Sequence, residues 1–224
     1  MRPVLGLLYD FHGNLSALDA VLDDCPAERF LLGGDYVLGG PWPVETVARL
    51  DELNAEWIRG NTDRWLVDDA DAPEPVQPAL AACRELLGDE LVQRLASLNE
   101  ETIRDDTLFC HASPGSDMVG FPEKASEKDS ELVRGVAQRR VVFGHTHIQF
   151  VRTTPEGIQL VNPGSVGAPF DQDRRAAYAL LHDDGRVERR RVEYDWEPVV
   201  ELVRERVGEP FASRLEQARL DPTP

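Results

Sequence analysis

Short apolar runs alternate with segments of helical periodicity through the first 61 residues, and this order restricts the possible folds more than any other feature. The runs at 4–9, 29–35 and 55–61 have the length and composition of buried strands. The segments 14–26 and 43–53 between them have helical spacing, with a cap residue or a proline at the start. The order strand, helix, strand, helix, strand predicts βαβ units and a parallel sheet.

The middle of the chain departs from this alternation. Residues 73–105 begin with a proline-rich stretch and continue with leucines at helical spacing, so we expect a helical insertion beside the sheet. Strands are predicted at 107–111 and 139–145. Between them, the polar, glycine-containing residues 114–130 indicate a loop that could overhang a site, and a short helix is expected over 130–138.

Two turn signals organise the last third of the chain. The sequences TPEG and DG each separate two strand-like runs, which predicts hairpins at 148–162 and 176–194 and an antiparallel second half. Helices are predicted at 196–207 and 209–219. Because no repeat or linker divides the chain, we expect residues 1–224 to form a single domain.

The charge balance narrows the possible partners. With 41 acidic and 24 basic residues, the net charge is -17. Such a surface repels a phosphate backbone and disfavours nucleic acid as a partner. It does not exclude a local cationic pocket, and bound metal ions can create one.

Cysteine use and hydropathy bear on the compartment. The odd count and wide spacing of Cys25, Cys83 and Cys110 indicate free thiols rather than a disulfide framework. No apolar run approaches the roughly 20 residues of a membrane helix. We therefore expect a cytoplasmic protein that is not bound to membranes.

Polar side chains that can hold a metal ion follow five consecutive predicted strands. In chain order they are Asp10 and His12, Asp35, Asn61 and Asp63, His111, and His145 and His147. In open α/β sheets, sites form outside the carboxyl ends of the strands. Four of the five histidines lie there, while His182 falls at a hairpin and is expected to be structural or exposed.

The mixture of carboxylate, imidazole and amide groups indicates the type of site. A closed structural zinc site would favour thiolates, whereas this set suits divalent metals that keep positions open for water and substrate. These candidate ligands are too many for one tetrahedral ion, but they suit two ions about 3.5–4 Å apart that share a carboxylate. The surplus positive charge would bind an anion.

Five motifs carry a resemblance to a known family. DFHGN, GGD, GNTD, CH and GHTH, in this order, resemble the signature of the calcineurin-like metallophosphoesterases across about residues 4–170. GGDYVLGGPWPVETVARL and HTHIQFVRTTPEGIQLVNPGSVGAPF resemble its small single-domain prokaryotic branch. The resemblance implies a four-layer α/β fold, in which two mixed β-sheets pack together and are flanked by helices.

The resemblance also implies residue roles. It assigns Asp10, His12 and His147 to a first metal, Asn61, His111 and His145 to a second, and Asp35 to both. The implied reaction is phosphoester hydrolysis by a metal-bound hydroxide, for which we expect Asp35 and His145 to be catalytic. Manganese, iron, nickel, cobalt and zinc all remain possible metals.

Departures from the family pattern affect the expected substrate. Many family phosphatases carry a histidine, a proposed proton donor, where this chain has Thr62, which favours small phosphodiesters or nucleotides over monoesters with poor leaving groups. A phosphomonoesterase and a catalytically silent metal-binding scaffold remain alternatives. We expect Asn14, Asn61 and Arg64 to contact substrate, although Asn14 mainly caps a helix. Tyr9 is expected to point away from Asp10 into the core.

Overall fold

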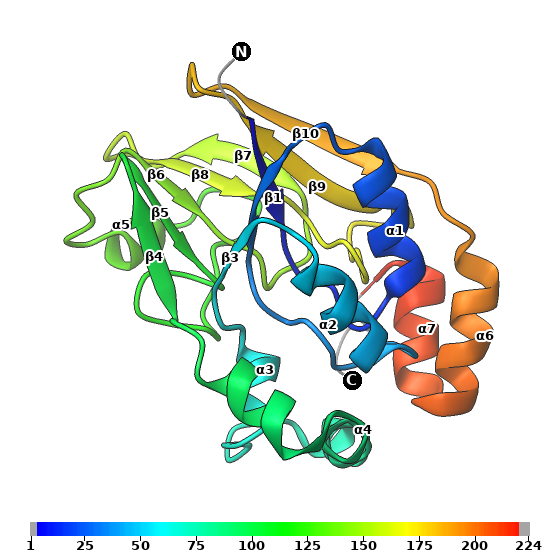
Figure 1. Cartoon of the computed structure of the whole chain (residues 1–224). Coiled ribbons are helices and arrows are strands. Elements are labelled where there is room, and N and C mark those ends of the chain that lie inside the picture. Colours follow the sequence, from blue (N-terminus) through cyan, green and yellow to red (C-terminus); the bar gives the residue numbers. More distant parts are fainter. Residues whose placement is uncertain (1–3, 220–224) are drawn as a thin grey trace.

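The structure, a computed structural model, describes residues 4–219 and contains two five-stranded sheets (Figure 1). The first sheet has the strand order β10-β9-β1-β2-β3. Its strands are β1 (Leu5–Leu8), β2 (Arg29–Leu32), β3 (Ala55–Trp57), β9 (Ala176–Leu181) and β10 (Val187–Val192). The strands β1, β2 and β3 are parallel, whereas β9 pairs antiparallel with both β1 and β10.

The second sheet has the strand order β4-β5-β6-β8-β7. Its strands are β4 (Glu101–Arg104), β5 (Thr107–Cys110), β6 (Arg140–Val142), β7 (Phe150–Thr153) and β8 (Gln159–Asn162). The three central strands β5, β6 and β8 are parallel, and the edge strands β4 and β7 are antiparallel to their neighbours. Both sheets are therefore mixed.

Helices lie outside both sheets (Figure 1). The described helices are α1 (Leu15–Asp24), α2 (Pro43–Asp51), α3 (Asn61–Trp65), η1 (Glu74–Val76), α4 (Gln77–Ala96), α5 (Asp129–Leu132), α6 (Trp196–Arg206) and α7 (Glu209–Gln217). The helices α1 and α2 cover the first sheet, and the C-terminal pair α6–α7 packs beside α1. The second sheet is covered by the short α5 and by the loop that precedes it.

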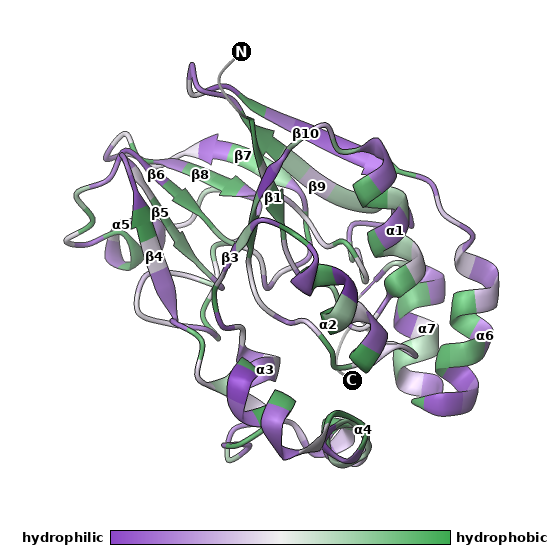
Figure 2. Ribbon diagram, viewed as in Figure 1, coloured by the Kyte–Doolittle hydropathy of each residue, from purple (hydrophilic) through white to green (hydrophobic). Residues whose placement is uncertain are grey.

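A buried apolar layer joins the two sheets. Its members come from strands of both sheets: Leu7, Tyr9, Leu31, Ile58, Phe109, Val142, Val161 and Ala179. Tyr9 is fully buried there and its hydroxyl donates to the Val142 carbonyl at 3.3 Å, which confirms its predicted place in the core. Figure 2 shows the central strands as apolar, whereas the edge strand β10 is largely hydrophilic.

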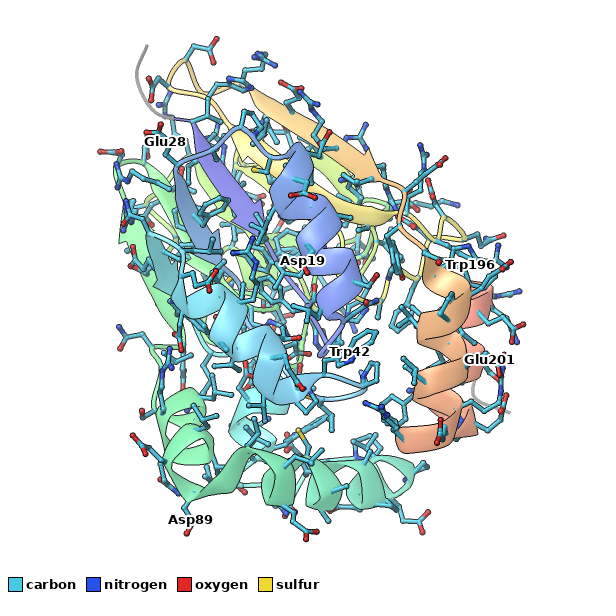
Figure 3. All side chains as sticks on the ribbon, turned by 45° about the vertical axis from the view of Figure 1, so that its right-hand side comes forward. Asp19, Glu28, Trp42, Asp89, Trp196 and Glu201 are labelled. Carbon is cyan, nitrogen blue, oxygen red and sulfur yellow. The ribbon has the colours of Figure 1, made fainter. Side chains whose placement is uncertain are left out.

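The outer surfaces are rich in charged side chains. Asp19 on α1, Asp89 on α4 and Glu201 on α6 project outward from their helices (Figure 3). Trp42 instead packs into the apolar cluster of α6 and α7. Across residues 4–219, no helix combines the length and the apolar character that a membrane span requires.

The predicted fold class, the βαβ start and both hairpins are confirmed. The prediction that the second half is antiparallel is wrong for β6 and β8, which run parallel to each other. The reason is that β9 and β10 return to the first sheet and leave β8 to pair with β6. Local turn signals define a hairpin but not the sheet that it joins.

Several predicted boundaries differ from the structure. The helical insertion ends at Ala96, because residues 101–104 form the strand β4, joined to β5 by a tight turn at Asp105. The strand expected over 55–61 ends at Trp57, and α3 begins at Asn61. The helix expected over 130–138 is the four-residue α5, which ends at Leu132.

Candidate metal centre

The predicted ligands come together where the carboxyl ends of strands from both sheets meet. Asp10 and His12 follow β1, Asp35 follows β2, and Asn61 begins α3 after β3. From the second sheet, His111 follows β5, and His145 and His147 follow β6. Parallel strands present their carboxyl ends at one edge, so the βαβ topology accounts for the convergence.

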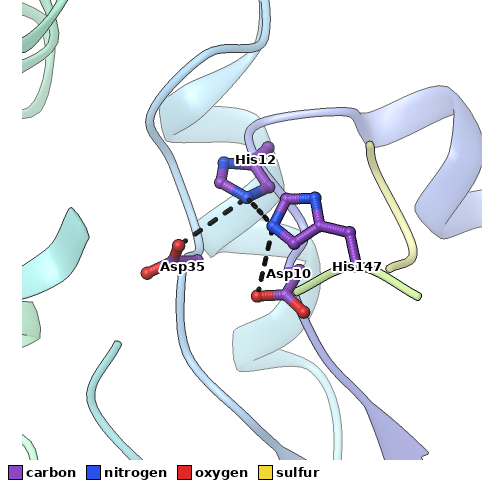
Figure 4. Close-up of side chains that lie close together, drawn as sticks. All are labelled: Asp10, His12, Asp35 and His147. Atoms are coloured by element: carbon purple, nitrogen blue, oxygen red, sulfur yellow. Dashed lines mark hydrogen bonds and ion pairs between the residues drawn. The ribbon is translucent and has the colours of Figure 1, made fainter. Parts of the chain in front are cut away.

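Four of these residues form a first cluster, shown in Figure 4. One ligand atom each from Asp10, His12, Asp35 and His147 lies within 4.8 Å of the others. His12 Nε2 is 3.1 Å from His147 Nε2 and 3.7 Å from Asp35 Oδ2. His147 Nε2 is 3.6 Å from Asp10 Oδ1. This cluster could hold a metal ion.

A second group of side chains adjoins the first. Asn61 Oδ1 is 3.0 Å from His111 Nε2 and 3.0 Å from His145 Nδ1. Asp35 Oδ1 lies 3.5 Å from His111 Nε2, so Asp35 contacts both groups. His111 Nδ1 is 2.8 Å from the Gly33 carbonyl, which directs Nε2 toward the group.

The hydrogen bonds of His12 and His147 suit a metal ion. His12 Nδ1 is 2.7 Å from the Leu38 carbonyl, and His147 Nδ1 is 2.5 Å from the Ala168 carbonyl. A carbonyl oxygen only accepts, so each Nδ1 must carry the proton. Two Nε2 lone pairs then face each other across 3.1 Å. A bound cation would turn this repulsion into ligation, so the donor set fits a divalent metal.

Burial keeps most of the imidazoles neutral. It lowers the pKa of His12 and, with His12 nearby, that of His147. Burial and the neighbouring His111 lower the pKa of His145 to about 4. Burial opposes ionisation of Asp35 as well, but attraction to His111 and the hydrogen bond from Thr62 N–H outweigh it and lower the pKa of that carboxyl to about 2. At neutral pH, His12, His145 and His147 therefore offer lone pairs and Asp35 offers a carboxylate, the forms that bind metals.

Asp63 positions the loops around the site. Its Oδ2 accepts from the backbone N–H groups of Asp35 and Gly60 at 2.8 Å each, and its Oδ1 accepts from Tyr36 N–H at 3.1 Å. The carboxylate thereby ties the turn after β2 to the turn after β3. Gly60 permits this approach, because a Cβ there would lie 2.2 Å from Asp35 Oδ1.

Most predicted ligands have a left-handed backbone. Their φ values are 57° for Asp10, 49° for His12, 59° for Asp35, 64° for His145 and 58° for His147. Outside glycine this conformation is uncommon and costs roughly 1–2 kcal/mol a residue. Strained backbone of this kind concentrates at functional sites, and its clustering here is independent support for one.

Five of the seven predicted ligands line a cavity of about 300 Å³: His12, Asp35, Asn61, His145 and His147. Most other lining residues are apolar: Leu38, Pro41, Trp65, Pro73, Pro75, Val76, Phe170, Val199, Val203, Phe211 and Leu215. The polar lining side chains outside the metal ligands are Asn14, Thr62 and Arg214. Sequence reasoning missed Arg214, because it lies in an amphipathic helix far along the chain from every motif.

Of the three residues predicted to contact substrate, Asn14 and Asn61 line the cavity and Arg64 does not. Asn61 lines the cavity. Asn14 also lines it, but its Oδ1 caps α1 through Ala17 N–H and its Nδ2 donates to Gly167 and Tyr194. These contacts leave the substrate roles of Asn14 and Asn61 as predictions.

Arg64 lies outside the residues that line the cavity. Its guanidinium forms paired hydrogen bonds with Asp71, at 2.8 and 2.9 Å, and with Asp117, at 2.7 and 3.2 Å. A substrate contact would require it to leave these carboxylates. The contact of Arg64 with substrate therefore also stays a prediction.

His182 lies apart from the metal ligands. It lies beside the β9–β10 hairpin, and its Nε2 is 3.0 Å from Glu188 Oε2. Its partly exposed place at a hairpin agrees with the structural role expected for it.

Comparison with known proteins finds relatives that match nearly the whole chain. The solved structure of a metallophosphoesterase from Sphaerobacter thermophilus is 28% identical, covers 97% of this chain and 100% of its own, and has a TM-score of 0.83. A hypothetical protein from Pyrococcus horikoshii OT3 shares the fold at 21% identity and a TM-score of 0.84, over 95% of this chain and 97% of its own. An uncharacterized protein of Methanocaldococcus jannaschii is 27% identical over 96% of this chain and 98% of its own length.

The family model for the calcineurin-like phosphoesterase superfamily domain matches residues 4–186, which include every predicted metal ligand. The strand-end ligands, the paired mixed sheets and this match agree on one assignment. The chain belongs to the calcineurin-like phosphoesterase superfamily, among metallophosphoesterases of the small single-domain type.

Proposed function

We propose that the protein is a dinuclear metal-dependent hydrolase that prefers phosphodiesters to phosphomonoesters. The observation that carries this proposal is the position of Asp35 between the two groups. Its Oδ2 lies 3.7 Å from His12 Nε2, and its Oδ1 lies 3.5 Å from His111 Nε2. A carboxylate that faces two ligand sets is what a shared ligand of two cations requires.

The ligand roles in the proposal follow these two groups. Asp10, His12 and His147 would hold one ion, Asn61, His111 and His145 the other, and Asp35 both. Two bound divalent cations would supply positive charge for the phosphoryl oxygens and a water of lowered pKa as nucleophile.

The protein's own contribution is to fix the ligands and to limit the negative charge around them. Thr62 N–H donates to Asp35 Oδ1 at 2.9 Å and holds the carboxylate in place. His145 N–H donates to both Asp10 oxygens, at 3.2 and 3.1 Å. Asn61 offers a neutral oxygen, so the ligand set carries only two carboxylates and keeps a surplus of positive charge for an anionic substrate.

Two features favour diesters. The Thr62 hydroxyl is buried in the cavity wall and has no hydrogen-bond partner among residues 4–219, and a threonine hydroxyl cannot supply a proton as histidine does. The apolar part of the cavity gives the second organic group of a diester a place to bind.

The partner in this proposal is a small phosphorylated molecule in the cytoplasm. The net charge of -17 disfavours a nucleic acid backbone. Oxygen and imidazole ligands accept manganese, iron, nickel, cobalt or zinc, and the supply of metal in the cell would select among them.

Hydrolysis of bis(4-nitrophenyl) phosphate and 4-nitrophenyl phosphate by metal-stripped protein tests the proposal. We expect turnover to return when manganese or another single divalent metal is added, with the diester preferred. A monoester preference would contradict the diester assignment. Two bound metals without turnover of either compound would favour the catalytically silent scaffold.

Substitution of the ligands tests the site itself. We expect His145→Ala and Asp35→Asn each to lower kcat/KM for the diester about a hundredfold or more, which corresponds to roughly 2.7 kcal/mol of transition-state stabilisation. His182→Ala is the matched control, because it removes an imidazole outside the cavity. Near-normal turnover in both ligand variants would overturn the assignment.

A further inference from the structure

Arg214, on α7, is a cation in the cavity wall without a carboxylate partner among residues 4–219. Its Nε is buried and has no hydrogen-bond partner there. Its guanidinium carbon lies 6.0 Å from the centre of the Phe211 ring. A buried guanidinium nitrogen without an acceptor is costly, so the position requires an explanation.

Arg204, on the neighbouring helix α6, shows how a surface arginine is usually paired with carboxylates. Arg204 on α6 bonds to Glu201 and Glu209 at 2.7 Å each and to Glu216 at 3.1 Å. In a chain with 41 acidic residues, carboxylates are abundant. Arg214 nonetheless lines the cavity, where the charge of its guanidinium would attract an anionic ligand.

The wall that carries Arg214 adjoins the first metal cluster. A Cβ on Gly39 would lie 3.0 Å from the Phe211 ring and 3.9 Å from His12 Nδ1. Gly39 has a φ of 104° and no side chain, so the Phe211 ring approaches the loop that carries His12. The cavity is therefore continuous from the metal ligands, past Phe211, to Arg214.

Most of the remaining lining of the cavity is apolar. Leu38, Trp65 and Val76 line the cavity from the body of the protein, and Val203 and Phe211 line it from the C-terminal helices. An aromatic or heterocyclic ring would bury its faces against such walls, whereas a fully hydrated group would lose water without replacement.

We propose that this cavity selects phosphoesters that carry a flat ring and a second anionic group, and that Arg214 binds this second anion. The inference rests on the proposed function, since it places the scissile phosphate at the metal ligands. It makes Arg214 a specificity-determining residue. A nucleotide with a second phosphate has the required combination of ring and charge.

Two substrates that differ in one phosphate test this inference. Thymidine 3′-(4-nitrophenyl phosphate) and its 5′-phosphorylated form share the ring and the scissile bond, and only the second carries another anion. For the manganese-loaded protein we expect the second to have a kcat/KM about tenfold higher or more. Arg214→Gln should abolish this ratio, and Arg214→Lys should retain part of it.

A binding measurement keeps the test independent of turnover. Calorimetry on the metal-free protein should show tighter binding of thymidine 3′,5′-bisphosphate than of thymidine 3′-phosphate, and Arg214→Gln should remove the difference. Arg204→Gln is the matched control, because it removes the same charge from the same helix pair outside the cavity.

The outcomes separate this inference from the proposed function. Suppose that bis(4-nitrophenyl) phosphate is hydrolysed but that Arg214→Gln changes neither the ratio of the two kcat/KM values nor the difference in binding affinity. The role proposed for Arg214 is then wrong, and the proposed hydrolase activity still stands. If no ester is hydrolysed but the difference in binding depends on Arg214, the anion site stands without the activity. If Arg204→Gln had the same effect as Arg214→Gln, the effect would come from the overall charge of the helix pair and not from a binding site, and the inference would be overturned.

Discussion

At the scale of single residues, the ligands adopt a backbone that their own side chains disfavour. Asp10, His12, Asp35, His145 and His147 all have positive φ values. The motifs predicted these residues as ligands, but nothing in the sequence predicted the conformation, because glycine is the residue expected there. We infer that the tight turns direct short side chains back toward one point and that the fold pays a local cost in stability for this geometry.

This strain predicts that glycine will be more stabilising than alanine at these positions, the reverse of the usual order. In metal-free protein, His145→Gly should be more stable to urea than His145→Ala by about 1 kcal/mol, because alanine retains the cost of a φ of 64°. His111 is the matched control, since it is a predicted ligand outside the set with positive φ, and there glycine should be the less stable variant. The same order of stability at both positions would show that the turn at His145 carries no strain.

The two arginines show that closeness to a motif along the chain does not determine which side chains line the cavity. Arg64 was predicted to contact substrate because it lies close to a ligand motif, but Asp71 and Asp117 occupy its guanidinium. Arg214 is distant from every motif and yet lines the cavity. The sequence could not predict which of the two arginines lines the cavity, because the partners of an arginine depend on tertiary packing.

At the scale of elements, local sequence patterns predicted where the strands lie along the chain better than which strands pair with each other. Apolar runs and turn residues located β1, β2, β9 and β10 closely, because short buried strands and short turns that contain glycine leave clear local signals. The placement of β9 beside β1 depends on contacts between residues far apart in the chain. The strand β4 was missed because only one of its faces is half-buried, so it lacks a strong apolar run.

The short helix α5 illustrates an element held by one buried ion pair. Asp129 is fully buried, and Arg152 on β7 bonds to both of its oxygens, at 2.5 and 2.9 Å. Arg152 also donates to the carbonyl of Pro122 in the preceding loop. Four residues cannot form a stable helix alone, so this pair fixes the outer layer of the second sheet.

Removing one partner of this pair should therefore destabilise the protein. We expect Asp129→Asn to lower the free energy of unfolding by about 3 kcal/mol, because it leaves the Arg152 charge poorly compensated in a buried place. Chemical denaturation measures the change. The exposed pair of Glu201 and Arg204 gives the comparison, since Glu201→Gln should cost less than about 1 kcal/mol. Equal losses in the two variants would mean that burial adds nothing to the pair.

At the scale of the whole molecule, the candidate metal centre lies at the junction of the two sheets. Asp10, Asp35 and Asn61 come from loops of the first sheet, and His111 and His145 from loops of the second. The direct contacts between the sheets are mainly apolar and lie behind the site. Bound metal would therefore link the two halves of the molecule at the end where the apolar layer does not reach.

Metal should consequently stabilise the fold as a whole. A ligand that binds only the folded state raises the free energy of unfolding by about 2.7 kcal/mol at a free concentration one hundred times its dissociation constant. Titrating manganese into chelator-treated protein should raise the thermal midpoint, and His111→Ala should reduce the gain by about 1.4 kcal/mol for each tenfold loss of affinity. His182→Ala should keep the full gain, because its imidazole pairs with Glu188 away from the site. If His111→Ala and His182→Ala gained equally from manganese, the metal would be bound elsewhere, and the ligand group around Asn61 would lose its assigned role.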